Sequence, residues 1–159
     1  MKTKARLGLL WASVTMLALP AVVQAQFDQM DNGDGTCTIT GYSGSGGAVA
    51  ITNTINDLVV TGIANWAFKN CTGLTGVTIP GSVTSIGDFA FIDCTNLTSV
   101  YFKGNAPGLG GMNVFKGDDK ATIYYLPDKT GWGSSFGGRP TAPWNPQVRS
   151  NATSSVRSN

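Results

Sequence analysis

The side chains of this 159-residue chain that could do chemistry are nine aspartates and three cysteines, Cys37, Cys71 and Cys94. The sequence contains no histidine, and every acidic residue is aspartate, so glutamate is missing as well. Most general acid–base catalysis and most zinc or iron sites depend on those two residue types. A cysteine nucleophile would also lack a histidine to activate it. We therefore assign no catalytic, metal-binding or cofactor-binding residue.

Aspartate alone leaves two chemical alternatives to consider. A glycan hydrolase would need two carboxylates about 5 to 10 Å apart across a cleft, and Asp88 and Asp93 are expected in a turn on the convex side, a poor place for a cleft. The turn sequence Asn32–Gly35 resembles part of a calcium loop. Met30, however, stands where the first ligand belongs, and no glutamate follows. A plain hairpin turn is the favoured interpretation.

A pattern of 23 residues occurs twice, and it must position any site that the chain has. Ile63–Ser85 reads IANWAFKNCTGLTGVTIPGSVTS, and Ile86–Pro107 reads IGDFAFIDCTNLTSVYFKGNAP. A further step of 23 residues carries Val100 to Ile123, which predicts a third strand. Repetition at so short a period is typical of a solenoid, in which each coil buries its apolar face against its neighbours.

Each repeat predicts a short strand followed by a tight turn. Val77 and Ile79 alternate with Thr78, which indicates a strand with one buried face, and Pro80 ends it. The segment Phe89–Phe91 is expected to begin a short helical turn mixed with 3₁₀. Strands of successive repeats should pair in parallel, about 4.8 Å apart. Equivalent side chains then stack in columns: Leu74/Leu97, Val77/Val100/Ile123, Ile79/Phe102/Tyr125 and Phe68/Phe91.

The phrase LTGVTIPGSVTSIGDFAFIDCTNLTSV resembles the BspA-like leucine-rich repeat of bacterial surface and secreted proteins. That family's pattern runs Leu, Ile-x-Ile-Pro, Val, Ile-Gly, Ala-Phe, Cys, Leu, and each place is filled here by the expected residue or an apolar equivalent. The resemblance implies a leucine-rich-repeat solenoid, with a short parallel β-sheet on one face and short helical or 3₁₀ turns on the opposite side. It also implies adhesion or protein binding outside the cell. Two repeats are complete, and Lys103 replaces the strand-ending proline in the second.

The beginning of the chain predicts a secretory signal peptide. Lys2, Lys4 and Arg6 precede an apolar run over residues 7–19, and residues 23–25 form a cleavage site of small residues. The run is shorter than the about 20 residues of a membrane span, although an uncleaved anchor helix is the alternative. The rest of the chain has 8 basic and 9 acidic residues, which argues against a nucleic-acid partner.

These observations predict five segments in a protein that is secreted or held at the cell surface. They are a signal peptide (1–25), an N-terminal cap resembling a β-hairpin (26–48), the repeats (49–125), a C-terminal cap (126–146) and a disordered polar tail (147–159). Trp132 and Phe136 are expected to cover the open end of the core. Trp66, Trp132 and Trp144 are all interpreted as packing residues, with Trp144 nearest the surface.

Cys71 and Cys94 occupy the same place in adjacent repeats, so stacking puts them within reach of a disulfide in an exported protein. Small buried thiols also fill the columns of repeat proteins, and we favour free thiols here. Cys37 has no obvious partner. Three glycosylation sequons are present, and the two within the repeats are interpreted as structural turns; they begin at Asn70, Asn96 and Asn151.

The exposed face of the predicted sheet is the candidate binding surface. Residues that alternate with the buried columns should point outward in one row, and that row includes two tyrosines. Tyrosine is a good contact residue because it is large, stiff and amphipathic. We predict that an extracellular protein or glycan binds, without catalysis, at Thr78, Tyr101, Lys103 and Tyr124. The alternative is a solvated face with β-forming residues, and hence a structural spacer of a larger surface protein.

Overall fold

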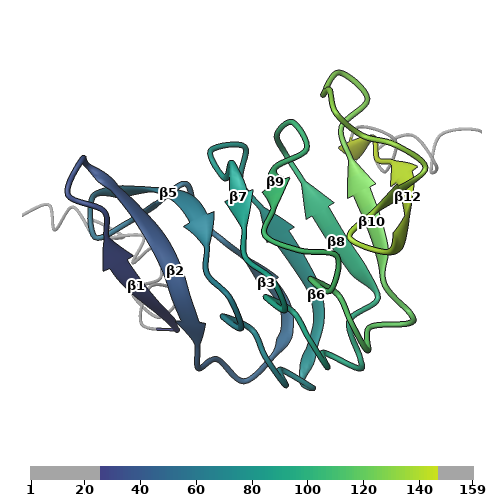
Figure 1. Cartoon of the computed structure of the whole chain (residues 1–159), viewed down its shortest axis with the longest axis horizontal. Helices are drawn as coiled ribbons and strands as arrows, with labels where there is room; N and C mark the ends of the chain where they lie inside the picture. The colour runs from purple at the N-terminus through teal and green to yellow at the C-terminus, as the bar shows by residue number, and fades with distance from the viewer. Residues whose placement is uncertain (1–25, 147–159) are drawn as a thin grey trace, which may run out of the picture.

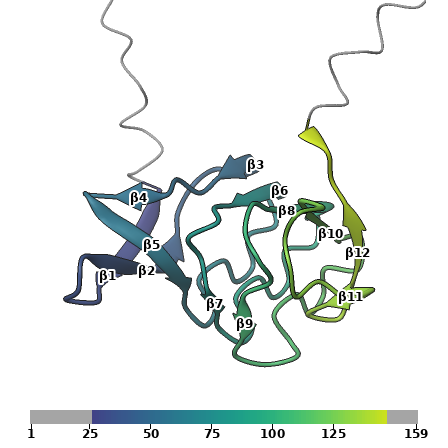
Figure 2. The same cartoon turned by 90° about the horizontal axis from the view of Figure 1, so that it is seen from above.

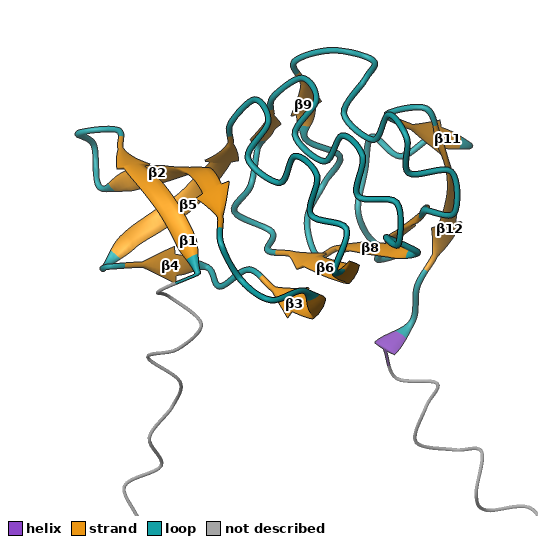
Figure 3. Cartoon of the chain, turned by 90° about the horizontal axis from the view of Figure 1, so that it is seen from below, coloured by secondary structure: helices purple, strands orange, loops and turns teal. Residues whose placement is uncertain are grey.

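The structure is a computed structural model that describes residues 26–146. The predicted signal peptide and the predicted tail lie outside the described residues. Within the described range the chain winds in successive coils that stack along one axis (Figure 1). Residues 26–145 contain strands, turns and loops but no helix, as Figure 3 shows. The described residues therefore include no helix that could span a membrane.

The main sheet has the strand order β11-β12-β10-β8-β6-β3. Its strands are parallel except at β11, which pairs with β12 in the antiparallel sense. Val77 pairs with Val100, and Val100 pairs with Ile123, which confirms the predicted column. The strands are β3 (Gly47–Ala50), β6 (Leu74–Ile79), β8 (Ser99–Phe102), β10 (Thr122–Tyr125), β11 (Ser135–Phe136) and β12 (Arg139–Pro143).

A second sheet, which the sequence did not predict, forms the opposite side of the coils (Figure 2). Its order is β1-β2-β5-β7-β9, with β4 paired to β5. Three of its strands, β4, β7 and β9, are two residues long, too short to show a period-2 pattern. The strands are β1 (Phe27–Asp31), β2 (Thr36–Tyr42), β4 (Thr54–Ile55), β5 (Leu58–Ile63), β7 (Ser85–Ile86) and β9 (Gly108–Leu109).

The N-terminal hairpin that the sequence predicts is formed by β1 and β2, which pair in the antiparallel sense. It closes one end of the core with aromatic side chains. The ring centroids of Phe27 and Tyr42 lie 6.3 and 5.3 Å from the ring centroid of Phe68. The last ring of the core at this end is thereby shielded from water, as a terminal coil of a solenoid requires.

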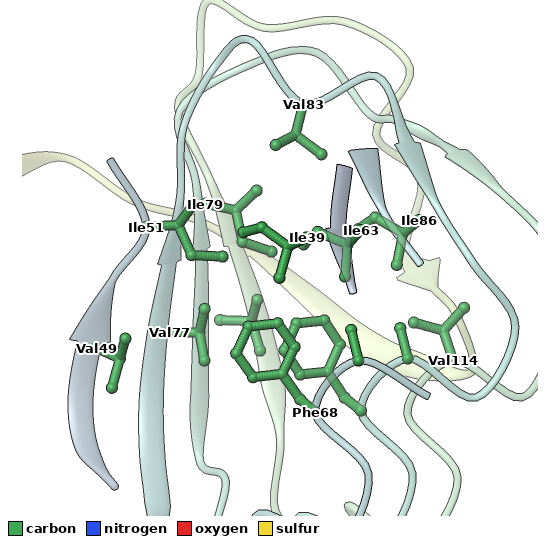
Figure 4. Packing of buried hydrophobic residues seen from close by; sticks show 14 of the residues in the cluster. Ile39, Val49, Ile51, Ile63, Phe68, Val77, Ile79, Val83, Ile86 and Val114 are labelled. Carbon is green, nitrogen blue, oxygen red and sulfur yellow. The ribbon is translucent and has the colours of Figure 1, made fainter. Parts of the chain in front are cut away.

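The core lies between the two sheets. Figure 4 shows Ile51 and Ile79, from the main-sheet side, pointing toward Ile39 and Ile63, from the second sheet. Phe68, Phe91 and Phe115 form a stack in this core with centroid separations of 4.7 and 5.2 Å, and all three side chains are fully buried. The third ring falls 24 residues after the second, because the third coil contains one inserted residue.

The segments that return the chain from the second sheet to the main sheet are turns. Single bonds of the i to i−3 type occur in them, such as Lys69 N–H to the Trp66 carbonyl (3.0 Å) and Ile92 N–H to the Phe89 carbonyl (3.1 Å). Trp66 and Phe89 have positive φ values of 58° and 57°. A right-handed helix requires negative φ at every residue, so the expected short helical segments take the form of turns.

Candidate functional site

Three of the four predicted contact residues lie side by side on adjacent strands of the main sheet. Thr78 on β6 pairs with Tyr101 on β8, and Tyr101 pairs with Tyr124 on β10. Their strand neighbours point into the core, so alternation turns these three side chains to the outer face, where each is half-buried. We call Thr78, Tyr101 and Tyr124 the tyrosine row.

The two tyrosine rings of the row stack on each other. Their centroids are 5.0 Å apart, and their planes differ by 18°. At that separation and angle the rings overlap face to face, because rings lying side by side in one plane would be farther apart. The row therefore presents ring edges and phenolic hydroxyls, with little free ring face between the two strands.

Trp144 extends the row into an aromatic cluster that the sequence did not predict. Its ring centroid lies 4.9 Å from that of Tyr101, with the planes inclined by 56°. Its backbone N–H donates to the Tyr125 carbonyl at 2.7 Å, which fixes the residue just after β12. The sequence contained one indication of this position, because Trp144 lies between Pro143 and Pro146, directly after the last strand. We call Tyr101, Tyr124 and Trp144 the outer cluster.

Lys103, the fourth predicted contact residue, lies one residue beyond the end of β8 and is exposed. Its backbone N–H donates to the Ile79 carbonyl at 3.1 Å, so the bonding between β6 and β8 continues through it. The structure thus places a cation just beyond the end of the strand that contains Tyr101, two residues away from that tyrosine. The combination of tyrosine hydroxyls with a flexible ammonium group suits contact with polar surfaces.

The three cysteines are free, which is the interpretation that the sequence favoured. The Cys94 thiol donates to the Phe68 carbonyl at 3.0 Å and is fully buried. Burial raises the pKa values of Cys37, Cys71 and Cys94. The thiols therefore stay protonated at neutral pH, and only a thiolate is a good nucleophile.

Asp118 takes the place of the cysteine in the third coil, and sequence reasoning missed it. Its side chain is fully buried, and neither carboxyl oxygen reaches a partner with ordinary hydrogen-bond geometry. Loss of hydration raises the pKa of Asp118 to about 7, although the Cys94 amide and the Arg139 guanidinium oppose the shift. Aligning the third coil with the second, with one inserted residue allowed, would have placed Asp118 at the position of Cys94.

The turn that resembled a calcium loop uses its oxygens within the turn. The Asp31 carboxylate accepts from Gly33 N–H at 2.7 Å, and the Asp34 carboxylate accepts from Thr36 N–H at 3.0 Å and from the Thr36 hydroxyl at 2.6 Å. These are local turn bonds of the Asx type. Residues 26–146 contain no group of three or more histidine, cysteine or acidic side chains arranged to hold a metal ion.

Two sequons lie in ordered turns, and the third, at Asn151, is outside the described residues. The Asn96 side-chain amide donates to the Thr72 carbonyl of the preceding coil at 2.8 Å. Asn70 has a positive φ of 59°, a conformation that asparagine tolerates better than most residues. Both asparagines therefore have a structural role in the turns.

The expectation that Trp66 is a packing residue is wrong. Its side chain is 55% exposed, whereas Trp132 and Trp144 are half-buried, so Trp66 and not Trp144 lies nearest the surface. The residues that fill the core in this turn are its neighbours Ala67 and Phe68, both buried. Because Trp66 precedes them in a left-handed conformation, its side chain is directed outward.

Parallel coils with a 23-residue period and stacked apolar columns define the class of leucine-rich-repeat solenoids. Residues 48–130 match the model of the BspA type leucine rich repeat region in 6 copies, and the chain belongs to this family. No curated protein matched the sequence significantly.

Among the solved structures that match this chain, two have a TM-score above 0.5. One is a leucine rich cell surface protein from Faecalibacterium prausnitzii, with 31% identity and a TM-score of 0.55 over 62% of this chain and 28% of that one. The other is a leucine-rich repeat protein from Bacteroides capillosus, with 25% identity and a TM-score of 0.53 over 76% of this chain and 95% of that one. The chain thus spans less than a third of the cell surface protein.

Proposed function

We propose that this chain is an exported, non-catalytic binding module, and that its outer cluster attaches it to another macromolecule outside the cell. The observation that carries the proposal is the grouping of Tyr101, Tyr124 and Trp144 on one sheet face, with ring centroids 4.9 and 5.0 Å apart. Aromatic residues at such a place commonly dominate binding energy. The predicted signal peptide and the likeness to a cell surface protein support the location.

A protein fits this surface better than a glycan. A sugar ring binds on an open aromatic face, whereas Tyr101 and Tyr124 cover each other's faces. Their hydroxyls and the ammonium group of Lys103 can instead bond to carbonyl groups and acidic side chains of a partner protein. The same surface would be unimportant in a purely structural spacer, so changing it separates the two hypotheses.

The test is the paired substitution Tyr101→Ala and Tyr124→Ala in the chain that follows the predicted signal peptide. Immobilised protein is exposed to a panel of extracellular matrix proteins and glycans, and affinity is measured for each member that binds. We expect the double variant to lose about tenfold or more in affinity for a protein, with an unchanged circular dichroism spectrum.

The matched control is the pair Tyr101→Phe and Tyr124→Phe, which keeps the rings and removes the hydroxyls. An intermediate loss would show that the hydroxyls contribute to contact. Equal binding by the wild type and the alanine pair would refute a role for the outer cluster and favour the spacer.

A further inference from the structure

A second aromatic surface lies away from the main sheet, on the turns that join β5 to β6 and β7 to β8. Trp66 and Phe89 occupy the same place in successive coils. Their centroids are 6.2 Å apart, and their planes differ by only 7°. Phe89 is half-buried and is the one ring in contact with Trp66 among residues 26–146. We call these two residues the aromatic ridge.

The backbone of the ridge is in a conformation that suits other residues better. A left-handed conformation costs about 1–2 kcal/mol for a residue with a side chain, and only Gly, Asn and Asp adopt it routinely. At the next left-handed position of each coil this chain uses Asn70, Asp93 and Gly117, with φ values of 59°, 59° and 86°. At the ridge it uses a tryptophan and a phenylalanine instead. The residue types at the ridge are therefore not those that the backbone conformation favours.

Hydrogen bonds between the coils hold the ridge in place. The Trp66 N–H donates to the Asp88 carbonyl at 3.4 Å, and the Asp88 N–H donates to the Asn65 side-chain oxygen at 2.9 Å. One Asp88 carboxylate oxygen accepts from Phe89 N–H at 3.1 Å and from Asn113 N–H at 3.2 Å. Strained residues persist where the surroundings fix them in this way, and they are concentrated at functional sites.

The size of the ridge limits what can bind there. A tryptophan side chain covers roughly 250 Å², so a little over half of it offers on the order of 140 Å², and a stable protein interface needs about 800 Å² from each partner. An exposed indole face, supported from behind by a parallel ring, is instead the size of one sugar ring. Asn65 directly precedes Trp66 and is exposed. Its side-chain oxygen accepts from Asp88 N–H, and its amide nitrogen can donate to a hydroxyl group.

We propose that the aromatic ridge is a glycan-binding site, in which a neutral pyranose ring stacks on the exposed face of Trp66 and one of its hydroxyls accepts from the Asn65 side-chain amide. The site is separate from the outer cluster and does not depend on it. It would add a sugar contact to the protein contact proposed for the main sheet.

The experiment compares wild-type protein with Trp66→Asn in native gels that contain a neutral polysaccharide. The panel consists of mannan, galactomannan, arabinoxylan, mixed-linkage β-glucan and hydroxyethylcellulose. We expect at least one polysaccharide to retard the wild type, and its apparent affinity to fall about tenfold or more in Trp66→Asn. The melting temperature should stay within about 3 °C of the wild type, because asparagine accepts the left-handed conformation while the ring contact is lost.

Two controls keep the result specific. Met112→Asn removes another exposed apolar side chain, 88% exposed in the following coil, and should bind as the wild type does. The Tyr101→Ala and Tyr124→Ala pair should also keep its polysaccharide binding, which separates this site from the outer cluster. The proposal is overturned if no polysaccharide in the panel retards the wild type, or if Trp66→Asn is retarded equally. The proposal would also be overturned if Trp66→Asn kept its polysaccharide binding and lost its binding to a protein, because the ridge would then be a protein contact.

Discussion

Asp118 shows how a single residue changes the chemistry of a repeat column. In the first two coils the column contains Cys71 and Cys94, which need little hydration, and in the third it contains a carboxyl group. Arg139 lies near, but one of its terminal nitrogens donates to the Asp118 backbone carbonyl at 3.2 Å and to the Asp119 carboxylate at 2.8 Å. The buried carboxyl group is therefore not neutralised by a direct ion pair, and the acid form is favoured.

This residue predicts that the protein loses stability as pH rises from about 4 to about 7. The pKa of Asp118 is about 7 in the folded state and 3.8 for an ordinary aspartate, so the folded state retains a proton that the unfolded state has released. The contribution of Asp118 to the free energy of unfolding should be greatest below about pH 4. It should decrease by on the order of 2–4 kcal/mol by pH 7. Urea denaturation at several pH values measures the slope.

Asp118→Asn is the control, since asparagine has nearly the same shape and does not titrate. Its stability between pH 4 and pH 7 should be nearly constant, and it should exceed that of the wild type at pH 7. Asp34 and Asp128 act in the opposite sense, because hydrogen bonds from Thr36 and Lys129 lower their pKa values, but both are exposed. Equal slopes in the wild type and Asp118→Asn would show that another group titrates.

At the scale of the element, the coils depend on stacked aromatic rings where the turns pass beneath the main sheet. Phe91 is the middle ring, 4.7 Å from Phe68 and 5.2 Å from Phe115. Backbone bonds run along the same direction, from Phe68 N–H to the Ala90 carbonyl (2.7 Å) and from Phe91 N–H to the Val114 carbonyl (2.9 Å). Each coil is therefore tied to the next by both its core side chain and its main chain.

Phe91→Ala is expected to destabilise the protein by about 3–5 kcal/mol, because the cavity would lie between two rings that the backbone holds in place. Chemical denaturation at constant pH measures the change. Phe91→Leu, which retains most of the volume, should cost much less. A loss below about 1 kcal/mol in the alanine variant would mean that the neighbouring coils can close the gap, and the stack would then not be the main contact between them.

At the scale of the whole molecule, each end of the solenoid needs a cover for its last coil. At the C-terminal end Trp132 stacks on Tyr125 at 5.3 Å, and both Trp132 and Phe136 pack on Phe102, at 4.9 and 5.5 Å. The indole N–H of Trp132 donates to the Gly104 carbonyl at 3.3 Å. β12, which lies next to the short edge strand β11, also contains two prolines, Pro140 and Pro143, which reduce the donors available for pairing near this edge of the sheet.

Trp132→Ala should therefore expose Phe102, which is 2% exposed in the intact protein. We expect lower thermal stability, stronger binding of a hydrophobic dye and association at high concentration, as for other uncapped repeat arrays. Differential scanning fluorimetry and light scattering measure these effects. Met30→Ala, at an exposed position of the N-terminal hairpin, should behave as the wild type. A monomeric Trp132→Ala variant with unchanged dye binding would contradict the capping role.

The sequence was most informative where identical positions recur. Val77, Val100 and Ile123 could be placed in one column because a side chain in a solenoid meets its own equivalent one period later. The same periodicity put Tyr101 and Tyr124 next to each other on the outer face. Trp144 could not be assigned to that face from the sequence, since it lies outside the repeats and reaches Tyr101 only through the path of the chain after β12.

The sequence by itself determined the period, the apolar columns, the pairing of the main strands and the N-terminal hairpin, because all of these follow from local pattern and repetition. Only the tertiary structure decided that Trp66 is exposed, that Asp118 is buried and that a second sheet closes the coils. These features depend on the backbone angles and on which parts of neighbouring coils pack together. The residue types alone determine neither of these. An exposed indole and a buried carboxyl group are both unusual for their residue types, so pattern alone predicts the opposite for each.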